Sequence, residues 1–306
     1  MSNSSASSLA PNSSGRAYLF LIFTTLCWGG NAIFSRLAVG EVSPMTLVML
    51  RWSGVILLLL VFARRNVRRD WPLLRPKLGF FFLWGAVGFT GFNSLFYIAA
   101  HTTTAVNIGI LQGSIPVFVF LGALVFFKTP INKSQMAGVA LTIIGVITVG
   151  AGGSFERLAA LDFNMGDFLM IIACLLYAGY TVALRFKPDV SAISFFTMLA
   201  GAAFLSTLPL LAGEILLGDF QAPTLTGWLL IGAIAVFPSF LAQLSFINGV
   251  TLIGPGRAGV FVNLVPIFAS IMAVIFLNEP FELYHGLSLL LVLGGIWLAE
   301  RGKKTA

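Results

Sequence analysis

Charged side chains are scarce in this chain. Only 9% of its 306 residues are Asp, Glu, Lys or Arg, whereas 58% are hydrophobic. A soluble domain carries about 25% charged residues, so a chain this poor in charge cannot cover a surface that faces water. The composition therefore excludes an ordinary soluble protein and indicates that lipid surrounds much of the chain.

Reactive side chains are also few. The sequence contains two histidines and two cysteines, Cys27 and Cys174, and it lacks an H-E-x-x-H motif. Two cysteines inside apolar segments can build neither a disulfide framework nor a metal site, so we expect both to pack. Without a nucleophile–base pair or a set of metal ligands, we expect no enzyme, no catalytic residue, no bound metal and no cofactor.

Long apolar runs occupy most of the sequence instead. A helix needs about 20 mostly apolar residues to cross the roughly 30 Å hydrocarbon core of a bilayer. The runs are continuous rather than alternating, which excludes spanning β-strands. We therefore predict an all-α integral membrane protein with ten transmembrane helices, at residues 18–38, 44–62, 78–98, 104–127, 134–151, 166–186, 191–212, 225–248, 256–277 and 283–299.

The basic residues gather on one side of these ten predicted spans. Apart from Arg51, which lies deeper in the second span, the opposite side receives only Arg36 and Arg157. The positive-inside rule then places both termini in the cytoplasm. The net charge of +7 indicates topology and contact with membrane lipid rather than nucleic-acid binding. The residues on the basic side are Arg16, Arg64, Arg65, Arg68, Arg69, Arg75, Lys77, Lys128, Lys133, Arg185, Lys187, Arg257, Arg301, Lys303 and Lys304.

Short polar segments precede and follow the spans. Residues 1–17 are rich in Ser and Asn and contain no apolar h-region, so we expect a disordered cytoplasmic tail rather than a signal peptide. Residues 300–306 form the predicted cytoplasmic C-terminal tail, and residues 64–77 form the predicted basic loop after the second span.

The two halves of the chain share motifs at a shift of about 150 residues. Gly109-x3-Gly113-x2-Pro116-Val-Phe118 in the fourth span matches Gly259-x3-Asn263-x2-Pro266-Ile-Phe268 in the ninth. In the same way, Trp28-Gly-Gly30-Asn31 in the first span corresponds to Tyr177-Ala-Gly179-Tyr180 in the sixth. The shared proline position makes chance similarity of apolar segments a poor explanation, so we infer an internal repeat.

Each repeat holds five spans, the first in residues 18–151 and the second in residues 166–299. Because five is odd, the second repeat enters the membrane from the opposite side, and the repeats are inverted. Inverted repeats build a binding site near the membrane midplane, between the halves, and expose it alternately to the two sides. Ten helices can enclose such a cavity in one chain, so a monomer is sufficient.

These motifs resemble the EamA branch of the drug/metabolite transporter superfamily. The resemblance rests on Trp28-Gly-x-Asn31, the prolines of the fourth and ninth spans, Asn278-Glu279-Pro280 and the five-plus-five repeat, and it covers roughly residues 18–300. The first half departs from the pattern, with Lys128-Thr129-Pro130 where the family more often has Gly-Glu. The resemblance implies export of amino acids, including aromatic ones, and related metabolites across the bacterial inner (plasma) membrane.

Polar and aromatic side chains inside the spans are candidates for a substrate pathway. Polar groups in a membrane are costly unless they face protein or water, and Thr24, Trp28 and Asn31 share one face of the first span. An alternative is that such residues only join helices through hydrogen bonds. The proposed pathway residues are Thr24, Trp28, Asn31, Asn93, Tyr97, Asn107, Ser114, Tyr177, Tyr180, Gln243, Phe246 and Asn263, with helix bends at Pro116 and Pro266.

The positions of the ionisable residues bear on how transport is driven. None of the eleven carboxylates lies in the middle of a predicted span, whereas proton-driven carriers commonly hold one at depth. We therefore expect facilitated diffusion or exchange rather than obligatory proton antiport. Arg51 lies about two turns into the second span, where snorkelling or pairing with an interfacial carboxylate is favoured over holding a substrate carboxylate.

The sequence thus predicts a transmembrane exporter, facilitator or exchanger of small organic solutes, most favourably amino acids. The alternative is a multidrug carrier or a carrier of another metabolite, such as a nucleoside, quaternary amine or sugar conjugate, with possible proton coupling. A cationic-drug pump would need a buried carboxylate, and a nucleotide-sugar carrier would need several basic residues at depth. A receptor or scaffold would not require the repeat.

Overall fold

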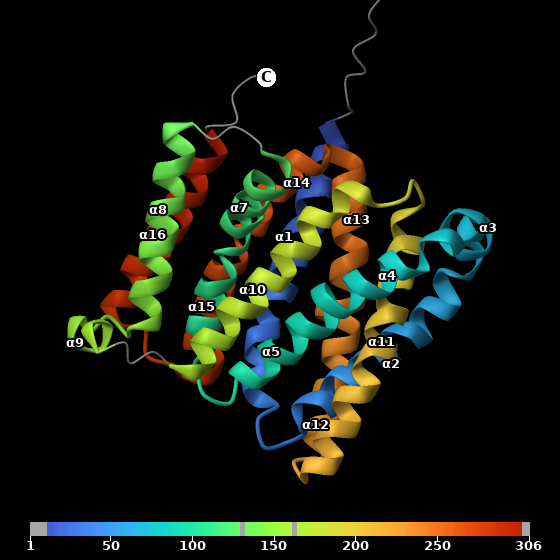
Figure 1. The fold of residues 1–306 in the computed structure, drawn as a ribbon, viewed down its shortest axis with the longest axis horizontal. Coiled ribbons are helices and arrows are strands. Elements are labelled where there is room, and N and C mark those ends of the chain that lie inside the picture. The colour runs from blue at the N-terminus through green and yellow to red at the C-terminus, as the bar shows by residue number, and fades with distance from the viewer. Residues whose placement is uncertain (1–10, 129–131, 161–163, 302–306) are drawn as a thin grey trace, which may run out of the picture.

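The computed structural model describes residues 11–128, 132–160 and 164–301, and the secondary structure in these ranges is entirely helical (Figure 1). The first half contains α1 (Pro11–Leu37), α2 (Pro44–Phe62), α3 (Arg64–Leu74), η1 (Arg75–Lys77), α4 (Leu78–Gly85), η2 (Ala86–Gly91), α5 (Phe92–Ala99), α6 (Ala105–Gln112), α7 (Ile115–Phe127) and α8 (Lys133–Gly150). The second half contains α9 (Phe155–Ala159), α10 (Met165–Ala183), η3 (Leu184–Phe186), α11 (Ala192–Leu217), α12 (Leu225–Ile234), η4 (Ala235–Leu241), α13 (Ala242–Ile253), α14 (Pro255–Val262), α15 (Val265–Leu277) and α16 (Leu283–Arg301).

The predicted number of membrane spans agrees with these helices. Within the described ranges, nine helical stretches are long and apolar enough to cross a membrane, and the apolar part of α16, Leu283–Ala299, is a shorter tenth. Cys27 and Cys174 are both free and buried, as expected of packing residues. The protein is therefore an all-helical, multi-pass membrane protein.

Two boundaries differ from the prediction. Residues 11–17 of the predicted N-terminal tail are helical, because α1 begins at Pro11; residues 1–10 and 302–306 lie outside the described ranges. The predicted loop at 64–77 is also wrong, because α3 and η1 make it helical and continuous with α4. Its arginines concealed an amphipathic pattern in which Val67 and Leu74, seven residues apart, pack on the core.

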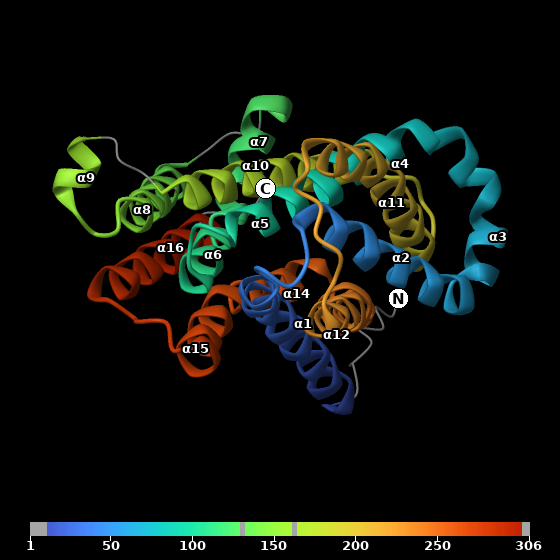
Figure 2. The same ribbon diagram turned by 90° about the horizontal axis from the view of Figure 1, so that it is seen from below.

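The bundle has two ends that are used as reference points below. The terminal end is the one at which α1 begins and α16 ends, at the top of Figure 1, and the opposite end holds α9 and α12. α1 begins at the terminal end, whereas α10, its counterpart by sequence, begins at the opposite end (Figure 1). Figures 1 and 2 both place α8 and α16 together at one edge, with α3 at the other.

Backbone irregularities recur in the two halves. A π-helix interrupts α4–α5 at η2 and α12–α13 at η4. Lys128 and Asn278, at the ends of α7 and α15, both adopt a left-handed backbone with φ of 51°. The same backbone geometry thus forms at Lys128 and at Asn278, although Lys128-Thr129-Pro130 differs in sequence from Asn278-Glu279-Pro280. Thr129 and Pro130 themselves lie outside the described ranges.

Carboxylates near the ends of helices act as caps for helices of the other half. At the opposite end, Glu214 accepts hydrogen bonds from the backbone nitrogens of Met45 (2.8 Å) and Thr46 (3.2 Å) at the start of α2. At the terminal end, Asp70 accepts from the backbone nitrogen (3.0 Å) and Oγ (2.6 Å) of Ser191 before α11. A negative charge at a helix N-terminus satisfies free N–H groups and the helix dipole, so these contacts fix α11 against α2 at one end and against α3 at the other.

A second group of polar contacts closes the opposite end between α1, α6, α10 and α16. Glu279 accepts from the backbone nitrogens of Ala105 (2.9 Å) and Val106 (3.0 Å) and lies 3.7 Å from the Nε of Arg36. Arg36 also donates to the carbonyl of Ala100. Burial and the nearby charge of Arg36 lower the pKa of His101, which lies between the spans, so its imidazole is neutral at pH 7.

Glycines allow α8 and α16 to approach closely. A Cβ built on Gly295 would meet Thr142 Oγ1 and lie 2.5 Å from the carbonyl oxygen of Gly138, whereas a Cβ on the adjacent Gly294 would have no heavy atom within 4 Å. No hydrophobic driving force acts between helices in lipid, so their association depends on close van der Waals packing. Small residues at the crossing let the two backbones come close enough for it.

We expect Gly295→Ala to destabilise the fold by about 1–3 kcal/mol, since the backbones of α8 and α16 must separate to admit the methyl group. Thermal unfolding of the detergent-solubilised protein measures the effect. Gly294→Ala is the matched control and should leave the melting temperature unchanged or slightly higher. Equal effects of the two substitutions would contradict the packing described for this helix pair.

Candidate functional site

A cavity of about 140 Å³ lies between the two halves. Its wall is contributed by α1, α2, η2, α5, α6 and α7 of the first half and by α10, α11, η4, α13, α14 and α15 of the second. The aromatic residues of the wall are Trp28, Trp52, Phe89, Phe92, Tyr177 and Phe196, and its polar residues are Asn31, Arg51, Asn93, Gln112, Ser239, Gln243 and Asn263. A concave, largely apolar space with a few polar groups is the usual form of a small-molecule site.

The two broken helix pairs form part of this wall. Between α6 and α7 the break falls at Gly113 and Ser114, and between α14 and α15 it falls at Asn263 and Leu264. Pro116 and Pro266 follow these breaks in the first turn of the next helix, where the missing N–H costs nothing, and both line the cavity. The predicted bends are therefore present at the site.

The π-helix η4 supplies hydrogen-bonding groups to the same space. Pro238 has no backbone N–H, and the carbonyl of Ile234 accepts instead from Oγ of Ser239 (2.5 Å). The carbonyl of Pro238 accepts from Nε1 of Trp28 (3.2 Å). π-Helical turns are frequent at functional sites, and here the turn directs one carbonyl and one hydroxyl towards the first half.

Among the described residues, Arg51 is the one cationic side chain on the cavity wall. It is 7% exposed, and its Nε donates to Ser239 Oγ (2.8 Å), while Nη1 donates to Asn93 Oδ1 (2.5 Å) and Tyr97 Oη (2.7 Å). In the described part of the chain it forms no ion pair. The expectation that Arg51 snorkels or pairs with a carboxylate was therefore wrong, because neutral acceptors from α5 and η4 hold it inside the bundle.

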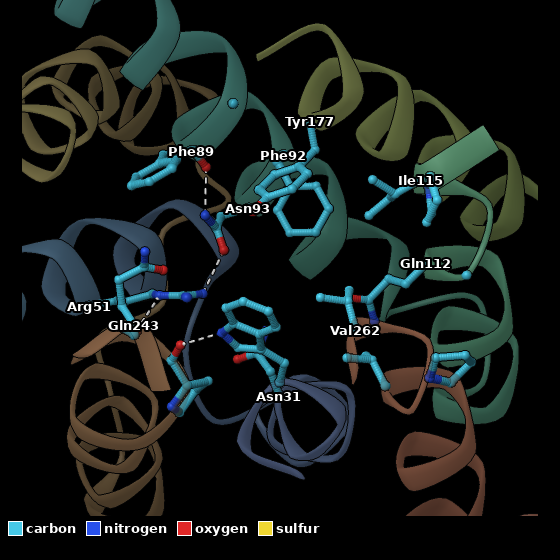
Figure 3. A pocket seen from close by; sticks show the side chains of 18 of the residues that line it. Asn31, Arg51, Phe89, Phe92, Asn93, Gln112, Ile115, Tyr177, Gln243 and Val262 are labelled. Carbon is cyan, nitrogen blue, oxygen red and sulfur yellow. Dashed lines mark hydrogen bonds between the residues drawn. The ribbon is translucent and has the colours of Figure 1, made fainter. Parts of the chain in front are cut away.

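The Arg51 contacts extend to α1 and to the aromatic wall. Tyr97 donates from its hydroxyl to Asn31 Oδ1 (3.0 Å), so one chain of hydrogen bonds joins α1, α5 and α2. The guanidinium carbon of Arg51 lies 5.2 Å from the ring centroid of Trp52, which stacks on Phe89 at 5.1 Å and 15°. Figure 3 shows Arg51 directed towards Asn93, and Phe92 and Tyr177 on the same side of the cavity as Asn93.

The predicted pathway residues fall into three groups. Those that line the cavity are Trp28, Asn31, Asn93, Tyr177, Gln243 and Asn263. Tyr97 and Phe246 stand directly behind it, since Tyr97 contacts Arg51 and Asn31, and the ring of Phe246 lies 5.3 Å from that of Trp28. The remaining four, Thr24, Asn107, Ser114 and Tyr180, do not line the cavity.

Each of these four has neighbours elsewhere in the bundle. Thr24 donates to the carbonyl of Ala242 (3.0 Å), Ser114 donates to that of Leu111 (2.6 Å), and Tyr180 packs edge-on against Phe89. Asn107 belongs to the opposite end, where its Nδ2 donates to Asp167 Oδ2 (3.1 Å) and its Oδ1 lies 3.1 Å from His285 Nε2.

Sequence reasoning left out several residues that line the cavity, including Trp52, Phe89, Phe92, Gln112 and Phe196. Aromatic residues are common throughout the spans, so nothing in the sequence marks those that face the cavity. A single charge inside an apolar span is a stronger signal of a functional position, and Arg51 carries that signal.

In the described ranges, nine apolar helical stretches long enough to cross a membrane and a shorter tenth lie around a cavity shared by two similar halves, which is the architecture of a multi-pass membrane transporter. A family model described as the EamA-like transporter family matches the chain twice, at residues 15–151 and 164–300. The chain belongs to this family, and it is a membrane transporter rather than an enzyme. The double match also agrees with the repeat seen in the sequence.

Individual relatives agree with the family. The chain is 27% identical over 294 residues to the uncharacterized transporter YetK of Bacillus subtilis (strain 168), covering 94% of this chain and 88% of that protein. It is 25% identical over 297 residues to the uncharacterized inner membrane transporter YedA of Escherichia coli (strain K12), with 93% and 90% covered. A solved structure described only as a crystal structure of protein has a TM-score of 0.61 at 18% identity, covers 92% of this chain and 96% of its own, and supports the fold.

We expect Tyr97→Phe to destabilise the protein by about 1–2 kcal/mol, because Asn31 and Arg51 both lose a buried partner. Thermal unfolding in detergent measures the change. Tyr177→Phe is the matched control, since no hydrogen bond of its hydroxyl is found among the described residues, and its melting temperature should match that of the parent. A Tyr97→Phe protein as stable as the parent would show that this hydroxyl does not hold the helices together.

Proposed function

We propose that the protein moves small organic solutes, foremost amino acids including aromatic ones, across the bacterial inner membrane through this cavity. The observation that carries the proposal is the combination of aromatic rings and side-chain amides on a cavity shared by the two halves. Rings pack on the apolar part of such a solute, and amides donate to and accept from its polar groups.

The size of the cavity favours a solute of this class. The cavity volume of 140 Å³ is about ten times the space that one water molecule needs, which suits a small solute such as an amino acid better than a nucleotide sugar. In the described part of the chain no Asp or Glu lines the cavity, which disfavours quaternary amines and other cationic drugs relative to amino acids.

The repeat supports transport by alternating access. Inverted repeats can exchange conformations, so that the cavity opens to one side and then to the other. The polar contacts of Glu214, Glu279 and Arg36 join helices of different halves at the opposite end. We propose that these contacts break when the cavity opens towards that end, and that the terminal end, which carries the basic helix α3, is cytoplasmic. One chain suffices for this cycle.

The proposal predicts uptake of labelled amino acids into proteoliposomes that contain the purified protein. Trp28→Ala should lower uptake by about tenfold or more, since it removes a ring from the cavity wall and the hydrogen bond to Pro238. Trp228→Ala is the matched control, because Trp228 is 53% exposed on α12 and does not line the cavity. A panel that also contains nucleosides, quaternary amines and sugar conjugates tests the alternative.

Failure of all aromatic and aliphatic amino acids in that panel, with transport of another class, would overturn the amino-acid assignment. Equal activity of the Trp28→Ala and parent proteins would remove Trp28 from the pathway.

Transport should also proceed without an imposed proton gradient. No carboxylate among the described residues lines the cavity, so no acidic group there can exchange a proton as solute binds. Counterflow of labelled against unlabelled solute, at equal pH on both sides and with a protonophore present, measures this directly. Solute movement that occurs only with a pH difference would establish proton coupling and contradict the facilitated or exchange mechanism.

A further inference from the structure

Arg51 has hydrogen-bond donors that the protein leaves unused. A guanidinium carries five N–H groups, and the three neutral acceptors Ser239, Asn93 and Tyr97 occupy Nε and Nη1. Among the described residues no hydrogen bond is made by Nη2, and Arg51 lines the cavity. In the described part of the chain the two N–H groups of Nη2 therefore remain available to donate charge-assisted hydrogen bonds to an anion in the cavity.

The charge of Arg51 is also uncompensated. The ion pairs found in the described ranges involve other residues, Arg36 with Glu279 and Arg69 with Asp70. The carboxylate of Glu214, on α11, already accepts hydrogen bonds from the backbone nitrogen of Met45 in α2 and from Oγ of Ser43. A buried cation without a counter-ion is costly, and an anion entering the cavity would offset that cost.

The rest of the wall offers little to a positive group. Asn93 Oδ1 already accepts from Arg51, and Asn31 Oδ1 accepts from Tyr97. The described lining residues that remain to accept from an ammonium group are neutral amides, such as Gln243 and Asn263. The cavity therefore carries a net positive charge beside flat aromatic surfaces, among them Trp52 and Phe89.

We propose that Arg51 is the anion-binding residue of the cavity, and that the cavity accepts small carboxylates with a flat apolar body whether or not they also carry an amino group. This inference rests on the transport role proposed above and sharpens it, since it makes the carboxylate, rather than the amino group, the part of an amino acid that is recognised. Deaminated analogues then bind at least as tightly as the amino acids themselves.

A series of ligands with one ring and different charges tests the proposal on the full-length parent protein. The probes are 3-phenylpropionate (anion), L-phenylalanine (zwitterion), 3-phenyl-1-propanol (neutral) and phenethylamine (cation), and isothermal titration calorimetry in detergent measures binding. We expect 3-phenylpropionate to bind about tenfold or more tightly than the alcohol and the amine, because only the carboxylate forms an ion pair with the guanidinium. Binding of the alcohol or amine as tight as that of the anion would overturn the proposal.

Variants of Arg51 identify the residue responsible. Arg51→Gln should reduce the affinity for 3-phenylpropionate to that for the alcohol and leave the alcohol's own affinity within about twofold, while Arg51→Lys should retain part of the preference. The matched control is Arg185→Gln, since Arg185 lies over the ring of Phe127 (4.4 Å) and does not line the cavity. An equal loss for all four ligands in Arg51→Gln would show a structural role instead. If Arg51→Gln does not fold, the charge series on the parent protein still decides the preference.

This outcome is separable from that of the transport proposal. If the protein transports other solutes in proteoliposomes and binds no member of the charge series, the inference about Arg51 fails and the transport role stands. If no solute in the wider panel is transported, the transport role fails, whereas the charge series still shows whether the cavity prefers anions.

Discussion

The burial of one cation inside the bundle governs the arrangement of its centre. Arg51 cannot be solvated by lipid, so the protein must supply acceptors, and these come from α5 and η4. Each acceptor is itself held in place: Asn93 donates to the carbonyl of Phe89 (2.6 Å), Ser239 donates to that of Ile234 (2.5 Å), and Tyr97 donates to Asn31 of α1 (3.0 Å). Four segments from both halves are thereby kept at fixed distances around the cavity, because moving any one of them would strand a buried polar group.

The carboxylates serve a different purpose from the cation. They lie close to the ends of helices, as their positions in the sequence suggested, and there they cap N-termini across the boundary between the halves. Capping satisfies backbone N–H groups that have no partner in lipid. The acidic residues therefore tie the halves together at their ends, whereas the centre contains a positive charge, aromatic rings and amides. The acidic groups at the ends of the bundle are thus separated in space from the positively charged cavity at its centre.

Much of this protein could be read from its sequence, and the failures have identifiable causes. Continuous apolar runs specify membrane helices, and the repeated proline motifs specify duplicated halves with helix breaks before Pro116 and Pro266. The segment 64–77 was mistaken for a loop, because its many arginines hid an apolar face that packs on the core. Asn107 was assigned to the pathway from its position in a span, but the side chain lies at the opposite end, beside Asp167 and His285.

Composition and the length of the apolar runs by themselves showed that lipid surrounds this chain and how many spans it has, because the hydrocarbon thickness of the bilayer and the rise of a helix act on local sequence. The motifs repeated at a shift of about 150 residues showed its division into halves. Only the tertiary structure decided which polar residues face the cavity. That depends on how each helix is rotated about its axis, and on the π-helical turns η2 and η4, which change the rotation of the residues that follow them. The partners of Arg51 lie 42 to 188 residues away along the chain. No local pattern could therefore show that Arg51 faces the cavity, or that its partners there are neutral groups rather than carboxylates.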